Sequence, residues 1–576
     1  MEFSIRYNHV GYAPKGPKVF LLACDSVGNP LKEMQPWFEI FAENGDRVYG
    51  AAMAEKGPCA YTDEFIWEGD FSALTRSGKY KIRVCVSDMS SSRINLSSPQ
   101  SFWRGEASIE SRGSSVDDVV VESKFFCVSD RLALEQLSLT LKSFYFQRSG
   151  VELTPDRAGK WARPAAHLDD CIEFHPSMNR KGTWNAHGGW YDAGDYGKYI
   201  VNGGVSVATL LLTAEFADDR RVTFGNGSFF DAGSFRANLL EEIRFELEFF
   251  LRMQDTDGGV FFKVSPVRWD GFVSPSQSDA LQKRQILGKS TTSTLNFAGT
   301  LAQAHRVFLP IYPSFAKKCL EASLRAYDWA VENPDVTYPH NTEGSGGYGD
   351  ERYDDEFFWT RAALFREGCD HFKDSLLSDM EKYPPDFGMS WRDTQNLGWI
   401  ALALQSQDLD LQVRARNTLK VVADEIVKLA GEDPYGLSIR KFVWGSNGEI
   451  ANHALTLFLV QEWFPSAAYA DCAKRMLDFV YGKNPVSRCF VTGAAWSSPK
   501  FPHHRICHSD GIEAPIPGLV VGGINADRQD LHRFPHYPGP QPGFSYTDER
   551  CSFASNETAI NWNAPLVAAL CFECMG

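Results

Sequence analysis

The sequence predicts a mainly α-helical protein, with a small all-β domain of immunoglobulin type at residues 1–105 and a large helical domain at residues 106–576. Three observations support this fold class. The chain has 576 residues, roughly four times a typical domain of about 150, so more than one core is expected. Composition is close to globular averages, with 43% apolar and 23% charged residues. After the segment 101–105 the spacing of apolar residues changes from that of strands to that of helices.

The predicted strands of the first domain are short runs of β-type residues separated by turn signals. Six or seven such strands are expected, among them Phe3–Tyr7, Lys18–Ala23, Trp37–Phe41, Phe65–Phe71 and Lys79–Val86. Runs at this spacing are typical of an antiparallel sandwich. Nothing in this domain has the residue types of a chemical site.

The predicted helices follow one another through the rest of the chain. They are 119–146, 196–215, 236–254, 292–307, 314–331, 354–367, 396–406, 413–430, 449–463, 467–482 and 556–572. Many are apolar over more than half of their circumference, so they are expected to pack on two sides. Few strands are expected among them, and no regular repeat is apparent, which favours an all-α toroid or solenoid over a repeat array. Long loops are expected at 150–190, 332–352 and 484–555, and loops of this length are usually functional.

Composition and charge exclude several classes of partner. The formal net charge is −15 and no run of Lys or Arg occurs, so neither nucleic acid nor an anionic membrane is an expected partner. No secretory signal is visible at the N-terminus, and no apolar run approaches the ~18 residues of a membrane span. The 13 scattered cysteines fit a reducing compartment, so we expect a cytoplasmic protein. The sequence does not indicate an oligomeric state.

Carboxylates stand at two distant places that could carry chemistry. Asp192 and Asp195 lie three residues apart in the Gly-rich segment 188–199, just before a predicted helix. This spacing puts both on one side of the helix start, where they could share a water molecule, or they could simply cap the helix. Glu557 opens the last predicted helix. It is either a reacting carboxylate or an acid of the first helical turn.

Two other segments add polar groups. The segment 502–505 places His503 beside Arg505, which suits capture of a hydroxylated ligand, with a solvated turn as the alternative. Residues 344–349 match a G-x-G-x-x-G pattern, but the acidic residues that follow would repel phosphate, so we expect an ordinary loop. Aromatic residues make up 13% of the chain, and flat aromatic faces are surfaces on which sugar rings stack. Paired carboxylates that act across a sugar bond are the chemistry of glycosidases.

At these residues the sequence resembles glycoside hydrolase family 9, which contains many endoglucanases. The matching segments are Asn8–Tyr12, Phe144–Arg148, Asp192–Asp195, Trp444–Asn447, Tyr481–Pro485, His503–Arg505 and Tyr546–Ala564. They cover nearly the whole chain, and the first belongs to the immunoglobulin-like domain of one subgroup. The family's usual Gly and Asn are Ala495 and Ser497 here, so the loop before His503 is expected to be reshaped.

The resemblance implies an (α/α)6 barrel and an inverting mechanism. It also implies a role for each matched site residue. Asp195 is the expected general base, Asp192 is expected to hold the water, and Glu557 is the expected general acid. His503 and Arg505 are expected to bind the sugar next to the cleaved bond, and Asp548 is expected to support the site as a further substrate-binding residue. No cofactor is required. Some relatives hold zinc at the positions of Ser149, Ala166, His167 and His187, but two thiolates are missing, so zinc is not expected. Relatives also bind calcium through an Asp–Glu pair that matches Asp355 and Glu356, whose oxygens suit calcium.

The expected function is inverting hydrolysis of β-1,4-linked oligosaccharides. A cytoplasmic enzyme would meet short, imported saccharides, so we expect exo action from the non-reducing end, of the β-glucosidase or exo-β-glucosaminidase type. For this the loops 150–190 and 484–555 would have to wall off the groove. The alternatives are an endo-β-1,4-glucanase and, from another class, a non-catalytic saccharide-binding protein that kept the barrel.

Overall fold

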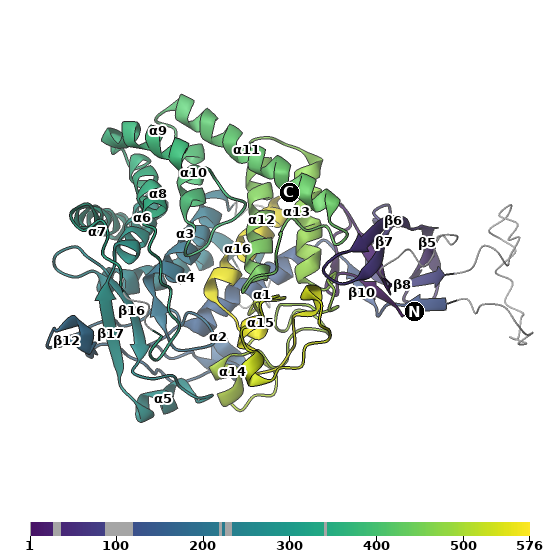
Figure 1. Cartoon of the computed structure of the whole chain (residues 1–576), viewed down its shortest axis with the longest axis horizontal. Helices are drawn as coiled ribbons and strands as arrows, with labels where there is room; N and C mark the ends of the chain where they lie inside the picture. The colour runs from purple at the N-terminus through teal and green to yellow at the C-terminus, as the bar shows by residue number, and fades with distance from the viewer. Residues whose placement is uncertain (1, 27–35, 87–118, 218–221, 225–232, 339–341) are drawn as a thin grey trace, which may run out of the picture.

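A computed structural model describes residues 2–26, 36–86, 119–217, 222–224, 233–338 and 342–576. It confirms the predicted fold class, because a small β-sandwich lies at one end of a larger (α/α)6 barrel (Figure 1). Among the described residues no helix is long and apolar enough to cross a membrane. All 13 cysteines are free.

The sandwich consists of two sheets whose facing side chains form a separate apolar core. One sheet has the order β1 (Phe3–Arg6), β3 (Val19–Asp25), β7 (Glu64–Asp70) and β6 (Ala54–Cys59). The other has the order β2 (Gly11–Tyr12), β10 (Phe126–Val128), β8 (Gly78–Val86), β4 (Trp37–Ala42) and β5 (Arg47–Ala52), with β9 (Val119–Glu122) also paired to β8. Every second residue of β8 is buried from Tyr80 to Val86, as expected for a strand with one face on a core. The five strands predicted by residue range are all present.

The sandwich extends further along the chain than predicted. The predicted boundary at residues 105 and 106 lies outside the described residues. Strand β9 pairs with β8, and β10 pairs with β2 and β8, so a segment assigned to the barrel completes the first domain. The helix predicted over 119–146 is therefore wrong at its start, and α1 covers Leu132–Gln147. Three consecutive valines at 119–121 favour a strand, because β-branched side chains pack well on a pleated surface.

The barrel is built from an inner and an outer ring of helices. The inner helices are α3 (Ile200–Phe216), α6 (Thr291–Phe308), α8 (Asp354–Phe365), α10 (Gln395–Leu404), α12 (Ser446–Gln461) and α16 (Ile560–Met575). The outer helices are α1, α4 (Phe235–Met253), α7 (Pro313–Glu332), α9 (Lys373–Lys382), α11 (Leu409–Glu432) and α13 (Ala467–Val480). Of these, α9 has no counterpart among the predicted helices.

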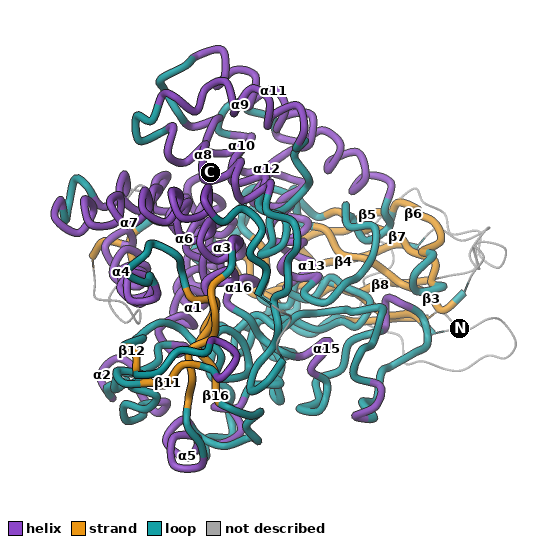
Figure 2. Tube along the Cα trace, turned by 60° about the vertical axis from the view of Figure 1, so that its left-hand side comes forward, coloured by secondary structure: helices purple, strands orange, loops and turns teal. Residues whose placement is uncertain are grey.

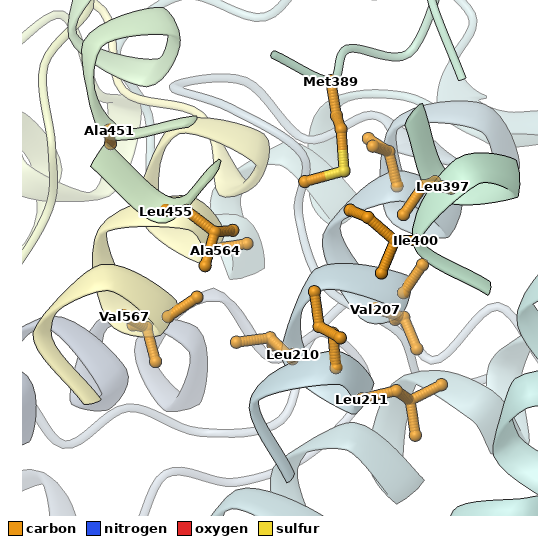
Figure 3. Close-up of a cluster of buried hydrophobic side chains, with 14 of the residues drawn as sticks. Val207, Leu210, Leu211, Met389, Leu397, Ile400, Ala451, Leu455, Ala564 and Val567 are labelled. Atoms are coloured by element: carbon orange, nitrogen blue, oxygen red, sulfur yellow. The ribbon is translucent and has the colours of Figure 1, made fainter. Parts of the chain in front are cut away.

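Burial separates the two rings. In α6, 16 of 18 residues are buried, because the helix has neighbours on all sides. In α7 only 7 of 20 are buried, at 316, 319, 322, 323, 326, 329 and 330, which is one apolar stripe at helical spacing. Side chains from α3, α10, α12 and α16 meet at the centre of the ring (Figure 3). Met389 belongs to this cluster and also lines the cavity described below, so the packed centre forms part of the cavity floor.

A five-stranded sheet also lies against the barrel, in a region where almost no strand was expected. Its order is β12 (Thr183–Trp184), β11 (Ile172–Phe174), β17 (Arg284–Lys289), β16 (Phe261–Pro266) and β13 (Lys198–Tyr199). All six residues of β16 are buried, so the strand lacks the polar–apolar alternation that reveals a strand in a sequence. The remaining elements are β14 (Thr223–Phe224), β15 (Gly233–Ser234), α2 (Pro155–Ala158), α5 (Pro275–Leu281), α14 (Arg505–Ser509), α15 (Phe553–Asn556) and five short 3₁₀ turns.

Polar contacts join the sandwich to the barrel. Strands β4, β7 and β8 lie on the side of α13 in Figure 2, and Arg475 of α13 pairs with Glu68 of β7 at 2.9 Å. Asn8 donates to buried Asp478 at 2.7 Å. His9 contacts the Ser497 hydroxyl at 2.5 Å and packs against Trp496. The first domain therefore supports the loop that leads to His503.

Candidate active site

The segment with the two aspartates is held between α3 and α16. The Asp192 amide donates to the Gly197 carbonyl at 2.9 Å, and the Asp192 carbonyl accepts from the Ile560 amide at 2.9 Å. Helix α3 begins after Tyr199 without a side-chain cap, so the helix-capping alternative for the aspartates is wrong. Both side chains line one cavity.

Asp192 is held as a hydrogen-bond acceptor at both oxygens. Asn202 donates to one oxygen at 2.7 Å and the Tyr348 hydroxyl donates to the other at 2.5 Å. Burial, with a smaller contribution from the charge of Asp195, raises the pKa of Asp192 to about 7, and the two donors oppose this rise. Among the described residues, Asp195 accepts a single, long hydrogen bond of 3.4 Å, from the Gly197 amide. Its carboxylate therefore keeps capacity to accept a proton from a ligand.

Glu557 enters the same cavity from the C-terminal part of the chain. It lies in extended backbone between α15 and α16, three residues before α16 begins, so the alternative of a first-turn helix acid is wrong. Its carbonyl accepts from the Gly522 amide at 2.8 Å. Burial, followed by the charge of Asp195, raises the pKa of Glu557 well above its usual range. A buried carboxyl that stays protonated is suited to donate a proton.

The cavity has a volume of about 1660 Å³. Five of the six predicted site residues line it: Asp192, Asp195, His503, Arg505 and Glu557. Asp548 does not, and its oxygens accept from the amides of Lys500 and Phe501 at 2.8 and 2.9 Å. The prediction of Asp548 as a substrate-binding residue is corrected accordingly, because its carboxylate fixes the backbone just before His503.

His503 and Arg505 differ in how free they are to bind a ligand. The His503 Nδ1 donates to the Arg550 carbonyl at 2.6 Å, and burial lowers the pKa of His503 to about 4, so the ring is neutral and Nε2 is an acceptor. The Arg505 guanidinium donates to the Gly194 carbonyl at 3.0 Å and twice to the Asp270 carbonyl at 3.2 Å. Arg505 thus links the loop that carries Asp192 and Asp195 to the loop that follows β16. The remaining N–H groups of its guanidinium are left to bind sugar.

Several residues that line the cavity were not predicted. Tyr348 lies in the Gly-rich segment 344–349, which was expected to be an ordinary loop. No pattern in the sequence around Tyr348 indicates that its side chain contacts Asp192. Aromatic side chains line two parts of the wall: Trp269 and Phe272 contact Arg505 and His503, and Trp391 contacts Tyr348. Trp444 and Trp562 also line the cavity. The excess of aromatic residues was a sequence signal for these side chains, and Trp444 and Trp562 also lie in the segments that resemble the family.

The positions at which relatives bind calcium have some features of a cation site and lack others. Asp350 and Asp355 lie close enough to Glu356 for their charges, added to burial, to raise the Glu356 pKa well above its usual range. Asp350 Oδ2 and Glu356 Oε2 are buried without a hydrogen-bond partner, which suits a hard cation. However, no three His, Cys, Asp or Glu side chains of the described residues are grouped as metal ligands. Calcium at Asp355 and Glu356 therefore stays a prediction.

The histidines at the zinc positions of other family members make protein contacts instead. The His167 ring bonds to the Tyr191 hydroxyl at 2.7 Å, and the His187 ring donates to the Leu168 carbonyl at 2.8 Å. Ser149 donates to the His167 carbonyl at 3.3 Å. Two hydrogen-bonded imidazoles without thiolates do not make up a structural zinc site.

A carboxyl with a raised pKa and two further carboxylates line one large cavity with aromatic walls. Such a set of carboxylates is typical of a glycoside hydrolase site. Comparison with known proteins supplies the family. The chain belongs to glycosyl hydrolase family 9, whose model matches residues 135–570, and the model of the cellulase N-terminal Ig-like domain matches residues 2–88. It is therefore an inverting glycoside hydrolase, and the non-catalytic alternative is wrong.

Individual relatives cover almost the whole chain. The xyloglucan-specific endo-beta-1,4-glucanase BoGH9A of Bacteroides ovatus is 32% identical over 98% of this chain and 92% of its own. A cellodextrinase of Butyrivibrio fibrisolvens is 28% identical over 98% of each chain. Among solved structures, Bacteroides ovatus GH9 superposes with a TM-score of 0.81 at 31% identity, covering 99% of both chains. A single-mutant thermostable endoglucanase from Alicyclobacillus acidocaldarius has a TM-score of 0.82 at 27% identity, covering 100% of both.

Proposed function

We propose that the protein cleaves β-1,4-glucan chains at internal linkages, with Glu557 as general acid and Asp195 as general base. The observation that carries the proposal is the convergence of Glu557 and the aspartate loop on one cavity of about 1660 Å³. This exceeds the roughly 300–1,000 Å³ of pockets for single small molecules. A cavity of this size suits several consecutive sugar rings.

The carboxylates divide the chemistry according to their surroundings. In the proposed reaction Glu557 protonates the glycosidic oxygen as the bond to C1 breaks, and water attacks C1 from the opposite face while Asp195 takes its proton. The products are a sugar with inverted configuration and a free alcohol. We assign Asp192 to holding the water, because Asn202 and Tyr348 already donate to its two oxygens.

Endo action replaces the exo action expected from the sequence as our main proposal. Exo action requires the cavity to be closed beyond the first sugar. Of the two loops expected to form that wall, 484–555 contributes lining residues, whereas no residue of 150–190 lines the cavity. The relatives include enzymes named endoglucanases, which supports the same proposal.

Viscosity and reducing ends, followed together during hydrolysis of xyloglucan and carboxymethyl cellulose, test the mode of action. Endo action lowers the viscosity steeply while few reducing ends have formed. Release of monosaccharide at unchanged viscosity would contradict the proposal and restore exo action. Glu557→Gln, prepared in parallel, controls for contaminating cellulases.

A further inference from the structure

Lys263 of β16 lies inside the fold, next to the segment that carries Tyr348. The residue is 0% exposed and does not line the cavity. Its ammonium donates to the Gly346 carbonyl at 3.1 Å and to the Ser345 hydroxyl at 3.3 Å. Gly346 and Tyr348 do line the cavity, so a buried ammonium holds part of the active-site wall from within.

The five-stranded sheet fixes Lys263 in this place. Strand β13 pairs antiparallel with β16 and brings Tyr199 opposite Lys263. The Tyr199 hydroxyl donates to the same Gly346 carbonyl at 2.5 Å, and the Tyr199 ring packs edge-on against Tyr348, with centroids 4.7 Å apart. Strand β13 begins three residues after Asp195. The strand beside Lys263 is therefore a direct continuation of the loop that carries the two aspartates.

The ammonium and the aspartates act on each other through their charges. Burial lowers the pKa of Lys263 to about 8, and the charge of Asp195, followed by those of Glu343 and Asp192, opposes this fall. In turn, the Lys263 charge lowers the pKa of Asp192, which burial and the charge of Asp195 raise to about 7. The ammonium is therefore largely protonated over the pH range in which Asp192 gains its proton.

Acids and tyrosines surround these two groups from several elements. The acids are Asp195, Glu246, Glu343 and Glu557. Burial raises the pKa of Tyr199 and that of Tyr348 well above the usual range, so both hydroxyls are neutral. The charge of Arg505 lowers the pKa of Glu557. Lys263 brings positive charge to carboxylates that repel one another, which stabilises their ionised forms.

We propose that Lys263 is a positioning residue for the hydrolysis, which holds the segment that presents Tyr348 to Asp192 and supplies a positive charge on the buried side of the two aspartates. The inference rests on the proposed reaction, in which Asp192 holds the water and Asp195 takes its proton. Lys263 acts through these carboxylates and does not touch the substrate. Loss of its charge favours the protonated form of Asp192, so the ionised form that can hold the water exists only at a higher pH.

The pH dependence of kcat/KM on an aryl β-cellobioside tests the proposal. Lys263→Gln removes the charge but keeps a hydrogen-bond donor, and Lys263→Arg keeps the charge. Tyr348→Phe is measured alone and combined with Lys263→Gln. The matched control is Lys283→Gln, since Lys283 pairs with Glu173 at 2.8 Å on the surface, so the same charge is removed away from the cavity. The Tm of each variant shows whether it is folded.

The proposal predicts that Lys263→Gln moves the acid limb up by roughly half a unit to one unit, which is about a three- to tenfold loss at a pH below the limb. Lys263→Arg should keep the wild-type limb, and so should Lys283→Gln. The charge of Lys263 acts on Asp192 independently of the Tyr348 hydroxyl, so the double variant should show the sum of the two single shifts.

Two results would overturn the proposal and leave the proposed hydrolysis intact. One is an unmoved acid limb in folded Lys263→Gln. The other is a double variant that shifts no further than Tyr348→Phe, because Lys263 would then only support the segment. If Lys263→Gln does not fold, Lys263→Arg decides, since an unmoved limb supports the role of the charge and a moved limb overturns it.

Infrared titration separates this inference from the proposed function. The carboxyl band that wild type shows and Asp192→Asn lacks reports the protonation of Asp192 without any turnover. If wild type hydrolysed no glycoside, the proposed function would fail, and this band would decide the inference. A titration that moves to higher pH in Lys263→Gln would support it, and an unchanged titration would overturn it.

Discussion

Tyr348→Phe removes one hydroxyl and isolates its effect on Asp192. The hydroxyl donates to Asp192 at 2.5 Å, and its ring packs against Tyr199 and Trp391, contacts that Phe can retain. Burial and the charge of Asp195 raise the pKa of Asp192 to about 7 although the hydrogen bonds from Tyr348 and Asn202 both lower it. Removing one of them must raise that pKa further, so Asp192 becomes protonated at a higher pH.

The size of the effect follows from the lost bond. A hydrogen bond to a charged group contributes about 1.5–3 kcal/mol, and one pKa unit corresponds to about 1.4 kcal/mol, so the pKa should rise by roughly one to two units. The ionised form exists above the pKa, and activity is therefore lost as the pH falls through it. The acid limb of the kcat/KM profile should move up by roughly one unit or more, with about a tenfold loss at a pH below the limb.

The assay is the pH dependence of kcat/KM on an aryl β-cellobioside. Tyr469→Phe is the matched control, since it removes a tyrosine hydroxyl that donates to the carboxylate of Asp424 away from the cavity. That control should keep the wild-type profile. An unmoved acid limb in Tyr348→Phe would refute the reasoning that Tyr348 sets the protonation of Asp192.

Three further predictions concern the support of the site. Arg505→Lys should lower kcat/KM by roughly 10- to 100-fold, because a single ammonium cannot hold the Gly194 and Asp270 carbonyls in the geometry of the guanidinium fork. Wild-type kinetics of this variant would show that the link between the two loops is dispensable. Gly194→Ala would place a Cβ 2.0 Å from the His503 carbonyl oxygen, so activity and Tm should both fall, and an unchanged Tm would contradict the packing. The Tm should be higher with calcium than with EDTA, because a ligand that binds the native state stabilises it. Asp355→Asn should abolish this difference. Equal Tm values of the wild type with calcium and with EDTA would exclude the site.

Local patterns were enough to predict most helices and the three carboxylates that line the cavity. The two aspartates share one short segment, and Glu557 lies in a run of residues typical of its family, so each could be recognised without knowing its spatial neighbours. The long inner helices could be predicted because each is a continuous apolar stretch of the sequence. The stretches are apolar because the helices are buried, so burial alone determines where these helices lie along the chain.

Features that depend on distant contacts could not be predicted. Tyr348 meets Asp192 across 156 residues, and only the fold brings them together. Strand β9 precedes α1 along the chain, and its valines extended the apolar pattern of the helix. Asp548 was expected among the substrate-binding residues, but its two oxygens accept from the backbone amides of Lys500 and Phe501, contacts that a sequence does not reveal.

The leaving-group dependence of hydrolysis in Glu557→Gln and Asp195→Asn tests the central assignment of acid and base most directly. A general acid contributes about 10²–10⁴-fold, so Glu557→Gln should lose that much on substrates with poor leaving groups and far less on aryl glycosides with good ones. Asp195→Asn should lose activity equally on both, because water must be activated whichever group departs. Similar, small losses in both variants on all substrates would contradict the assignment.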